Sequence, residues 1–317
     1  MRVYMKTRKI LALVLALLFV LPAFAACTSY RKGDTTAVMT VGGKKVTAEL
    51  LRYVCLKNSV YLFGEKVDPQ TLPEEKMKKL EDAVKNELRR YCAVETLADR
   101  YGVSLSGDDL DKIKDQISES KKTYDDVEDY YAQYESRYMT ENLFYEQTVN
   151  YYLERDLFDY ISEESSGVIF LSDADLIKDV HDHFFAAKQI LRSNAADREL
   201  LLSLRARVLE GEDFDALADE YSDDNVKSLR CFTEGEMQPF FEEAVRALEI
   251  GGVSEIVESS LGLHLILRCP LDDAYIDAHL EELRYSDLVR IYNGMIEEEA
   301  AGLEIVYTDK YTGLILT

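Results

Sequence analysis

The residues best suited to chemistry lie between positions 208 and 268. Asp224 ends the segment GEDFDALADEYSDD, and His264 lies in GLHLILR, five residues after Ser259. Met237 and Phe241 lie between these two segments, in EGEMQPFFEEAVRAL. A carboxylate, a hydroxyl and an imidazole can share hydrogen bonds, and Met and Phe side chains can form an apolar surface beside them.

In their order and spacing, four blocks in this stretch resemble the parvulin family of peptidyl-prolyl cis/trans isomerases. The family pattern runs G-x-D-F-x-x-L-A-x-x-Y-S-x-D, then G-x-M-x-P-x-F-x-x-A, then G-x-x-S, then G-x-H with two hydrophobic residues, and each block is present here. The resemblance covers about a third of the chain. It implies an isomerase domain over residues 170–270, with an α+β fold in which helices cover a small antiparallel sheet.

Rotation about an X-Pro bond is slow because twisting the amide removes its resonance, and the barrier is about 18–20 kcal/mol. A catalyst for this rotation needs an apolar cup for the proline ring and polar groups that favour the twisted amide. It needs no nucleophile, no metal ion and no other cofactor, so we expect none.

The resemblance assigns the cup to three residues: Met237, Phe241 and Leu229. Met and Phe at helical spacing are more often plain core residues, which is the alternative for them. Asp224 corresponds to the family's acidic or Cys position near the substrate carbonyl. Its neighbour Asp223 could be confused with it, and a solvated loop carboxylate is the alternative.

His264 corresponds to the family's histidine in the last strand, and Ser259 to a hydroxyl position that supports it. The alternative is a core histidine with satisfied hydrogen bonds. The family carries a second histidine in its first strand, just before Ile-Leu, where this chain has Gln189. A glutamine can donate and accept hydrogen bonds, but it cannot share a proton with His264 as a second imidazole can.

A second departure is the segment 225–232, NVKSLRCF, which replaces a longer glycine-rich segment of the family. Glycines permit backbone angles that are closed to most residues, so the rim of the site is expected to be reshaped. We therefore expect a peptidyl-prolyl isomerase with weakened catalysis. A holdase-type chaperone that keeps the parvulin shape without useful turnover is the alternative.

The first 26 residues have the pattern of an export signal. Four basic residues precede an apolar run from Ile10 to Leu21, which is too short to span a bilayer as a mature helix. The following AFAAC resembles a bacterial lipobox, with Phe24 where the family prefers Leu, and implies lipid modification of Cys27. Two acyl chains would hold the protein at the extracytoplasmic face of the cell membrane. Ordinary cleavage after Ala26, with Cys27 left as a thiol, is the alternative.

After a polar tether at 27–37, residues 38–164 read as a short strand followed by helices. The apolar stripe from Met77 to Tyr101 predicts a long helix that Gly102 ends, and Ser106 is a candidate cap for the next helix. The opening V-x-G-x-x-V-T followed by helices resembles the N-terminal chaperone domain of exported PrsA- and SurA-type foldases. The segment 271–317 contains an amphipathic helix, Leu280–Ile296, that we expect to pack on this N-terminal lobe.

Within 170–270, the pattern predicts strands at 184–192 and 263–268. Helices are predicted at 172–181, 194–209, 214–221 and 240–248. This order suits a small antiparallel sheet inserted in a mostly helical chaperone lobe. The alternating α/β pattern of a two-lobed solute-binding protein is absent.

The chain is acidic, with 37 Lys and Arg against 60 Asp and Glu and a net charge of −23. Such a surface disfavours nucleic acid as a partner. His181 and His183 are spaced to share one metal, but no third ligand follows at metal spacing, so no metal site is predicted. Besides Cys27, four cysteines remain, and the sequence leaves open whether Cys55–Cys92 and Cys231–Cys269 form bridges or stay as buried thiols.

The expected partners are unfolded or proline-containing exported polypeptides, together with the membrane through the lipid anchor. A homodimer is a possible state. A structural lipoprotein of the cell envelope is a third, weaker hypothesis.

Overall fold

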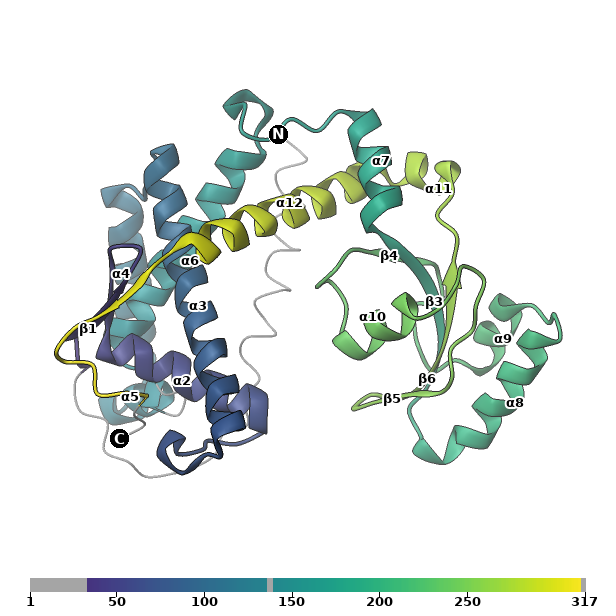
Figure 1. Ribbon diagram of the computed structural model, residues 1–317, viewed down its shortest axis with the longest axis horizontal. Coiled ribbons are helices and arrows are strands. Elements are labelled where there is room, and N and C mark those ends of the chain that lie inside the picture. The colour runs from purple at the N-terminus through teal and green to yellow at the C-terminus, as the bar shows by residue number, and fades with distance from the viewer. Residues whose placement is uncertain (1–32, 136–138, 315–317) are drawn as a thin grey trace. The chain divides into compact units, whose positions relative to one another are not determined.

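The computed structural model describes residues 33–135 and 139–314, in two compact units (Figure 1). The first unit comprises the described residues up to Tyr160 and again from Met295 onward, and the second comprises Ile161–Gly294. The predicted signal at 1–26 and Cys27, the predicted site of lipid modification, lie outside the described residues. None of the helices in the described ranges has the length and apolar character needed to cross a membrane.

The first unit is mostly helical, as the sequence predicts. Its helices are α2 (Ala48–Phe63), α3 (Glu74–Tyr101), α4 (Gly107–Lys121), α5 (Val127–Glu135) and most of α6 (Glu141–Ser162). Local signals set their ends: the Thr47 hydroxyl accepts from the Leu50 N–H at 3.2 Å at the start of α2, and Ser106 caps α4 in the same way. Gly102 ends α3 in the left-handed conformation, with φ 70°.

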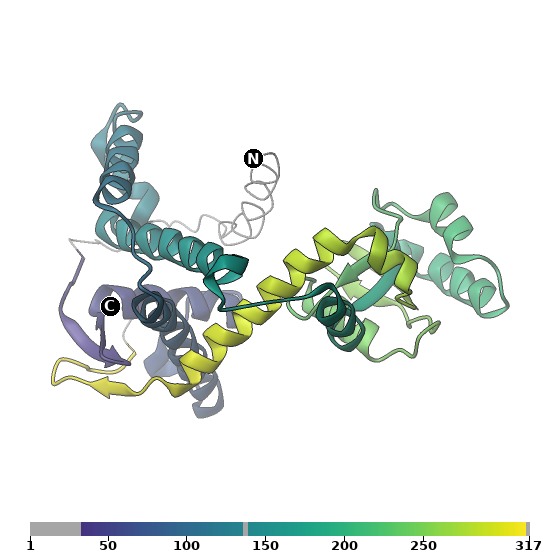
Figure 2. The same cartoon turned by 90° about the horizontal axis from the view of Figure 1, so that it is seen from above.

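A three-stranded sheet in this unit joins the two ends of the chain. Its order is β2 (Lys44–Thr47), β1 (Ala37–Val41) and β7 (Ile305–Tyr307), and both pairs are antiparallel. Thr40 lies opposite Val306, so the last strand lies beside the first, yellow against purple in Figures 1 and 2. The chain therefore leaves this unit, forms the second unit and returns.

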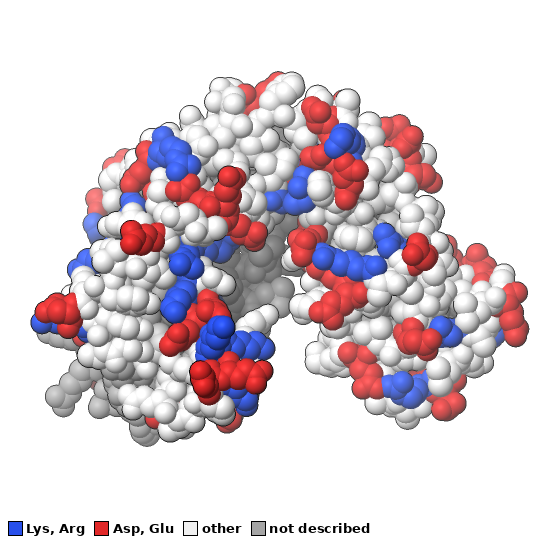
Figure 3. Space-filling model, viewed as in Figure 1, with Lys and Arg blue, Asp and Glu red and all other residues white. Residues whose placement is uncertain are grey.

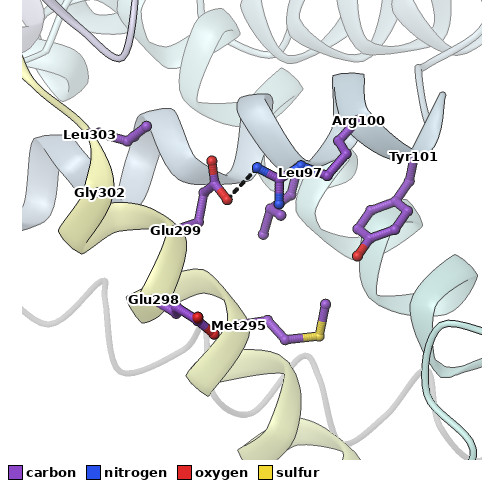
Figure 4. A pocket seen from close by; sticks show the side chains of 8 residues that line it. All are labelled: Leu97, Arg100, Tyr101, Met295, Glu298, Glu299, Gly302 and Leu303. Carbon is purple, nitrogen blue, oxygen red and sulfur yellow. Dashed lines mark hydrogen bonds and ion pairs between the residues drawn. The ribbon is translucent and has the colours of Figure 1, made fainter.

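A pocket of about 420 Å³ lies in the first unit, between α3 and the end of α12 (Leu280–Gly302) (Figure 4). Leu97, Tyr101 and Met295 line its apolar part. The Arg100 guanidinium donates to the Glu299 carboxylate at 2.6 Å across it. This ion pair and the apolar contacts hold the end of α12 against α3.

The second unit is built on a four-stranded antiparallel sheet with the order β4 (Arg230–Phe232), β3 (Phe185–Arg192), β6 (Gly262–Cys269) and β5 (Val257–Ser259). Its helices are α7 (Asp173–His183), α8 (Arg198–Leu209), α9 (Phe214–Tyr221), α10 (Pro239–Arg246) and α11 (Asp273–Ala278). The α+β class predicted from the sequence is confirmed. The strands β2, β4 and β5 were not predicted, because each has only three or four residues and lacks a readable period.

The two faces of this sheet are covered differently (Figure 1). The α8/α9 face carries Ile190, Leu263 and Leu265, which pack with Leu204 and Phe214 in one apolar cluster. The α10 face carries a second apolar cluster, formed by Ala187, Phe232, Phe241, Val245 and Ile266. Alternation along β3 and β6 produces both faces from the same two strands.

The segment 271–317 differs from the prediction that all of it packs on the N-terminal lobe. Ile276 and Leu283 are buried against Leu176, Val180 and Phe184 within the second unit, and only the chain from Met295 onward groups with the first. The predicted helix Leu280–Ile296 lies within α12, and a separate short helix, α11, precedes it. The start of α12 packs its apolar face against α7. The sequence pattern shows the apolar face but not the helix that covers it.

Charged side chains of both signs cover the face drawn in Figure 3, and Lys and Arg are interspersed there with Asp and Glu. Some ion pairs are local, such as Lys178–Asp182 within α7 and Arg207–Glu212 at the end of α8. The four described cysteines are free thiols. Cys231 and Cys269 both lie opposite Ala186, on either side of it, so two strand spacings separate them. That distance, roughly 9–10 Å, is too long for a disulfide.

Candidate functional site

The candidate site lies on the α10 face of the sheet, and strand register brings its side chains together. Leu191 pairs with His264, Gln189 with Ile266, and Ala187 with Arg230. Directly opposed residues in antiparallel strands project to the same side, and alternate residues along one strand share a side. Gln189, His264 and Arg230 therefore all project from three different strands to the α10 face.

Four polar side chains form one hydrogen-bonded chain across this face. Gln189 Nε2 donates to Asp224 Oδ2 at 2.5 Å, and Gln189 Oε1 lies 2.9 Å from His264 Nδ1. His264 Nε2 in turn lies 2.7 Å from Ser259 Oγ. The structure thus brings together Asp224, Gln189, His264 and Ser259, four of the residues singled out in the sequence.

The order of donors along this chain follows from Asp224. A carboxylate can only accept, so the amide nitrogen of Gln189 faces it and the amide oxygen faces His264. His264 Nδ1 must then carry the proton, and the bare Nε2 of the neutral ring accepts from the Ser259 hydroxyl. Each polar atom in the chain has a partner of the right kind, as buried polar groups require.

Burial and charge act in opposite ways on the two titratable groups. The His264 side chain is buried, and burial lowers its pKa, which the Asp224 carboxylate offsets only in part. For Asp224, burial by itself raises the pKa. The hydrogen bonds from Val226 N–H and Gln189 and the Arg230 guanidinium outweigh it and hold the pKa below its ordinary value. At neutral pH the site therefore contains a carboxylate and a neutral imidazole.

Asp223 and Asp224 have separate roles in the structure. Asp223 accepts from Arg192 Nη1 at 2.8 Å and from the Ser193 N–H at 2.9 Å, which ties the loop after α9 to the end of β3. Asp224 is the carboxylate that faces Gln189. The geometry therefore separates the two neighbours that the sequence left open.

The turn between β5 and β6 positions Ser259 and His264. Ser259 lies opposite Gly262, and the Ser259 hydroxyl also accepts from the Leu261 N–H at 3.0 Å. Gly262 has φ +134°, and a Cβ there would lie 2.2 Å from the carbonyl oxygen of Arg192. Only glycine fits this close approach, which explains the Gly before Leu-His in the motif.

The apolar residues predicted for the proline cup differ in their surroundings. Phe241 is 2% exposed and belongs to the core of the α10 face, whereas Met237 is only partly buried at its edge. Leu229 is partly buried in the loop before β4. The Glu242 carboxylate accepts from the N–H groups of Gly235 and Met237, both at 2.9 Å, and so holds the loop that carries Met237.

Two residues at the site were missed in the sequence. The Phe240 ring lies against the His264 ring, with centroids 5.0 Å apart, so Phe240 rather than Phe241 is the aromatic neighbour of the imidazole. Arg230 donates to Asp224 Oδ2 at 2.5 Å. Phe240 could have been considered, since it adjoins the motif phenylalanine. Arg230 carried no such signal, because its contact depends on the pairing of β4 with β3.

Among the described residues, His181 and His183 belong to no group of side chains arranged as a metal site. They end helix α7, and His181 Nε2 lies 3.1 Å from Asp273 Oδ1. Within the ranges that the structure describes, no group of three or more His, Cys, Asp or Glu side chains is arranged to hold a metal ion.

Two protein-family models match the chain. Residues 183–269 match the PPIC-type peptidyl-prolyl isomerase (PPIase) domain, and residues 1–157 match the SurA-like N-terminal domain. The first match covers the sheet and site of the second unit. The second match covers most of the helical first unit.

Similar proteins align with most of the chain or with part of it. The foldase protein PrsA of Caldanaerobacter subterraneus subsp. tengcongensis is 28% identical over 272 residues, which cover 82% of this chain and 82% of that protein. The foldase protein PrsA of Halalkalibacterium halodurans is 41% identical over 99 residues, 30% of this chain and 29% of that protein. The crystal structure of PrsA from Bacillus subtilis is 19% identical over 85% of this chain and 91% of that one, with a TM-score of 0.27.

The two domain matches and the long PrsA alignment agree with the site geometry on the α10 face. They identify the chain as a PrsA- and SurA-like foldase in which residues 183–269 form a parvulin-type peptidyl-prolyl cis/trans isomerase domain.

Proposed function

We propose that the protein is a lipid-anchored foldase of the extracytoplasmic face of the membrane, and that it isomerises X-Pro bonds of exported polypeptides with weakened catalysis. The observation that supports the site is the hydrogen-bonded chain Asp224–Gln189–His264–Ser259. The Phe240 ring lies against His264, and the partly buried Met237 packs on the same apolar cluster of the α10 face. The proline ring of the substrate lies on these apolar side chains. The polar chain provides fixed charge and dipoles beside the amide that must twist.

Weakened catalysis follows from what Gln189 does in this chain. Its amide uses one end for Asp224 and the other for His264, so it holds both groups in place. Unlike an imidazole, however, an amide does not titrate near neutral pH, so no proton can move between Asp224 and His264 through it. The geometry of the site is retained, but the proton-transfer route between Asp224 and His264 is lost. We therefore expect turnover up to about a hundredfold below that of an isomerase with two histidines, which is the size of one lost preorganised contact.

A protease-coupled proline-isomerisation assay on the chain from Thr28 onward tests this proposal. Met237→Ala should abolish both proline-peptide binding and turnover, because it removes one of the two partly exposed apolar side chains on which the proline ring is proposed to lie. Gln189→His should restore part of the lost activity. Leu209→Ala, an exposed residue at the end of α8, is the matched control and should leave turnover unchanged. Wild-type turnover equal to that of two-histidine isomerases would contradict the proposal, and so would full activity of Met237→Ala.

A holdase-type chaperone is the second candidate, and the SurA-like match over residues 1–157 favours it. Here the helical unit binds unfolded clients, and the isomerase domain contributes little turnover. An aggregation-suppression assay separates the two candidates when it is run on wild type and on Met237→Ala. Suppression that survives a complete loss of turnover would favour the holdase.

The anchor is proposed from the pattern of the first 27 residues, in which small residues precede Cys27. Cys27→Ala should move the processed protein from the membrane fraction into the soluble fraction. Retention of this variant in the membrane after removal of the signal would exclude the lipid anchor.

A further inference from the structure

Arg230 is the charged residue at the site that the isomerase motifs do not include. It lies on β4 opposite Ala187, and its Nη2 donates to Asp224 Oδ2 at 2.5 Å. The side chains of Arg230 and Asp224 are only 24% and 13% exposed, so solvent screens this ion pair less than a surface pair. Charge-assisted hydrogen bonds of this length are stronger than neutral ones.

Asp224 accepts from three donors, and hydrogen bonds to a carboxylate favour its ionised form. Val226 N–H reaches Oδ1 at 2.9 Å, while Gln189 and Arg230 share Oδ2. The other ionisable neighbours are engaged elsewhere or neutral. Asp223 is held by Arg192, and His264 on β6 is separated from Asp224 by Gln189. In the described part of the site, Arg230 is therefore the cation that contacts Asp224.

The Gln189 amide can point either its nitrogen or its oxygen at Asp224, and the charge of Asp224 determines which of the two it is. While Asp224 is ionised, Nε2 of Gln189 must face it and Oε1 must face His264. If Asp224 took up a proton, it could donate to Oε1 of Gln189. The amide would then turn by a half rotation and donate from Nε2 to His264 Nδ1.

That rotation would exchange the donor and acceptor roles along the whole hydrogen-bonded chain from Asp224 to Ser259. His264 would hold its proton on Nε2 and donate to Ser259, where it now accepts. No bond to carbon changes and no proton is lost overall. One proton is added at Asp224, and one moves from Nδ1 to Nε2 of the imidazole. A histidine at position 189 could respond to protonation of Asp224 by gaining or losing a proton. The glutamine amide can respond only by rotating.

We infer that Arg230 is a positioning residue for isomerisation: by keeping Asp224 ionised, it fixes the direction of the Gln189 amide and hence the protonated nitrogen of His264. Its role is to act through Asp224 rather than to touch the substrate. The inference rests on the proposed role of the polar chain in catalysis for its activity readout. Its spectroscopic readout does not depend on that role.

The direct test is ¹⁵N NMR of the histidine-labelled chain from Thr28 onward, with the four histidines assigned by substitution. At pH 7, wild-type His264 should have a protonated Nδ1 and a bare Nε2. Arg230→Met should bring in the tautomer that is protonated on Nε2 at a pH where wild type does not show it. A wild-type His264 that carries its proton on Nε2 would overturn the inference without any variant, so a variant that fails to fold leaves the test intact.

The activity test is the pH profile of kcat/KM. Removing the guanidinium takes away a group that lowers the pKa of Asp224, so the acid limb should move to higher pH, by about 1 unit or more. Arg230→Lys keeps the cation and should return the limb toward the wild-type position. Arg205→Met is the matched control, since Arg205 is similarly exposed at 26% and pairs with Glu255 at 2.6 Å, away from the site.

A purely structural role gives a different result. In that case Arg230→Met lowers kcat/KM by the same factor at every pH, leaves the His264 tautomer as in wild type, and overturns the inference. If the tautomer changes while kcat/KM and its pH profile stay constant, Arg230 directs the chain as inferred, and the proposed catalytic role of the chain is wrong.

Discussion

The two faces of the four-stranded sheet are formed by the same strands but have different roles. On the α8/α9 face, Ile190, Leu263 and Leu265 meet two helices, and the cluster is apolar throughout. On the α10 face, Gln189 and His264 come from the same two strands but form a polar chain beside a smaller apolar cluster. Apolar burial on the α8/α9 face stabilises the fold. The stable fold in turn keeps the polar groups of the α10 face in one arrangement.

The largest expected effect on stability comes from a substitution in the apolar cluster of the α8/α9 face. Leu265 is fully buried there, so Leu265→Ala should lower the free energy of unfolding by about 2–5 kcal/mol. Urea unfolding followed by circular dichroism measures this loss. The value of kcat/KM per folded molecule should stay within a few-fold of wild type. A loss of turnover larger than the loss of folded protein would show that the two faces are not separate in function.

A smaller effect is expected when the polar chain is interrupted on the α10 face. Gln189→Leu leaves the His264 Nδ1–H without its acceptor, while Asp224 keeps Arg230 and the Val226 N–H. The expected cost is about 1–3 kcal/mol, the cost of an unsatisfied buried donor. Urea unfolding checks the value. A variant as stable as wild type would mean that water or a rearranged side chain replaces the amide.

The α10 face should also make stability depend on pH, through His264. Burial lowers its pKa below the ordinary value of 6.5, so near and below pH 6.5 the unfolded chain binds a proton that the folded chain does not. This contribution to stability is present above pH 6.5 and is lost as the pH falls toward the lowered pKa. The slope from one group is at most about 1.4 kcal/mol per pH unit.

Urea unfolding at a series of pH values measures this slope. His264→Gln should flatten it between pH 6.5 and 5. His181→Gln, which changes an exposed histidine on α7, should leave it as it is. An equal slope in wild type and His264→Gln would assign the pH dependence to other groups.

The smallest effect concerns Cys231 and Cys269, on strands that flank β3. Because two strand spacings separate them, they should remain thiols, and a reducing agent should leave the melting temperature unchanged. Burial raises the pKa of the Cys231 thiol to about 12, so it should react slowly with thiol reagents at pH 8. Mass spectrometry after alkylation checks both expectations. A mass two units below the reduced chain would reveal a bridge.

Much of the local structure could be predicted from the sequence. The helix at Phe214–Tyr221 has the predicted bounds, Gly102 ends α3, and Ser106 caps α4. These features depend on residues within one or two helical turns, so a local pattern contains the information that sets them. The Met-Gln-Pro-Phe-Phe and Gly-Leu-His segments likewise marked the neighbourhood of the site, because their spacing resembles a known family.

Other features were decided only by the tertiary structure. Arg230 reaches Asp224, and Phe240 rather than Phe241 meets His264, because of strand register and the orientation of α10. The start of α12 packs against α7 although its sequence shows only an apolar face in need of a partner. A period along the chain determines which side of an element is apolar. Which residue from a distant strand or helix lies opposite is set by the pairing of elements far apart in sequence, and no local pattern records it.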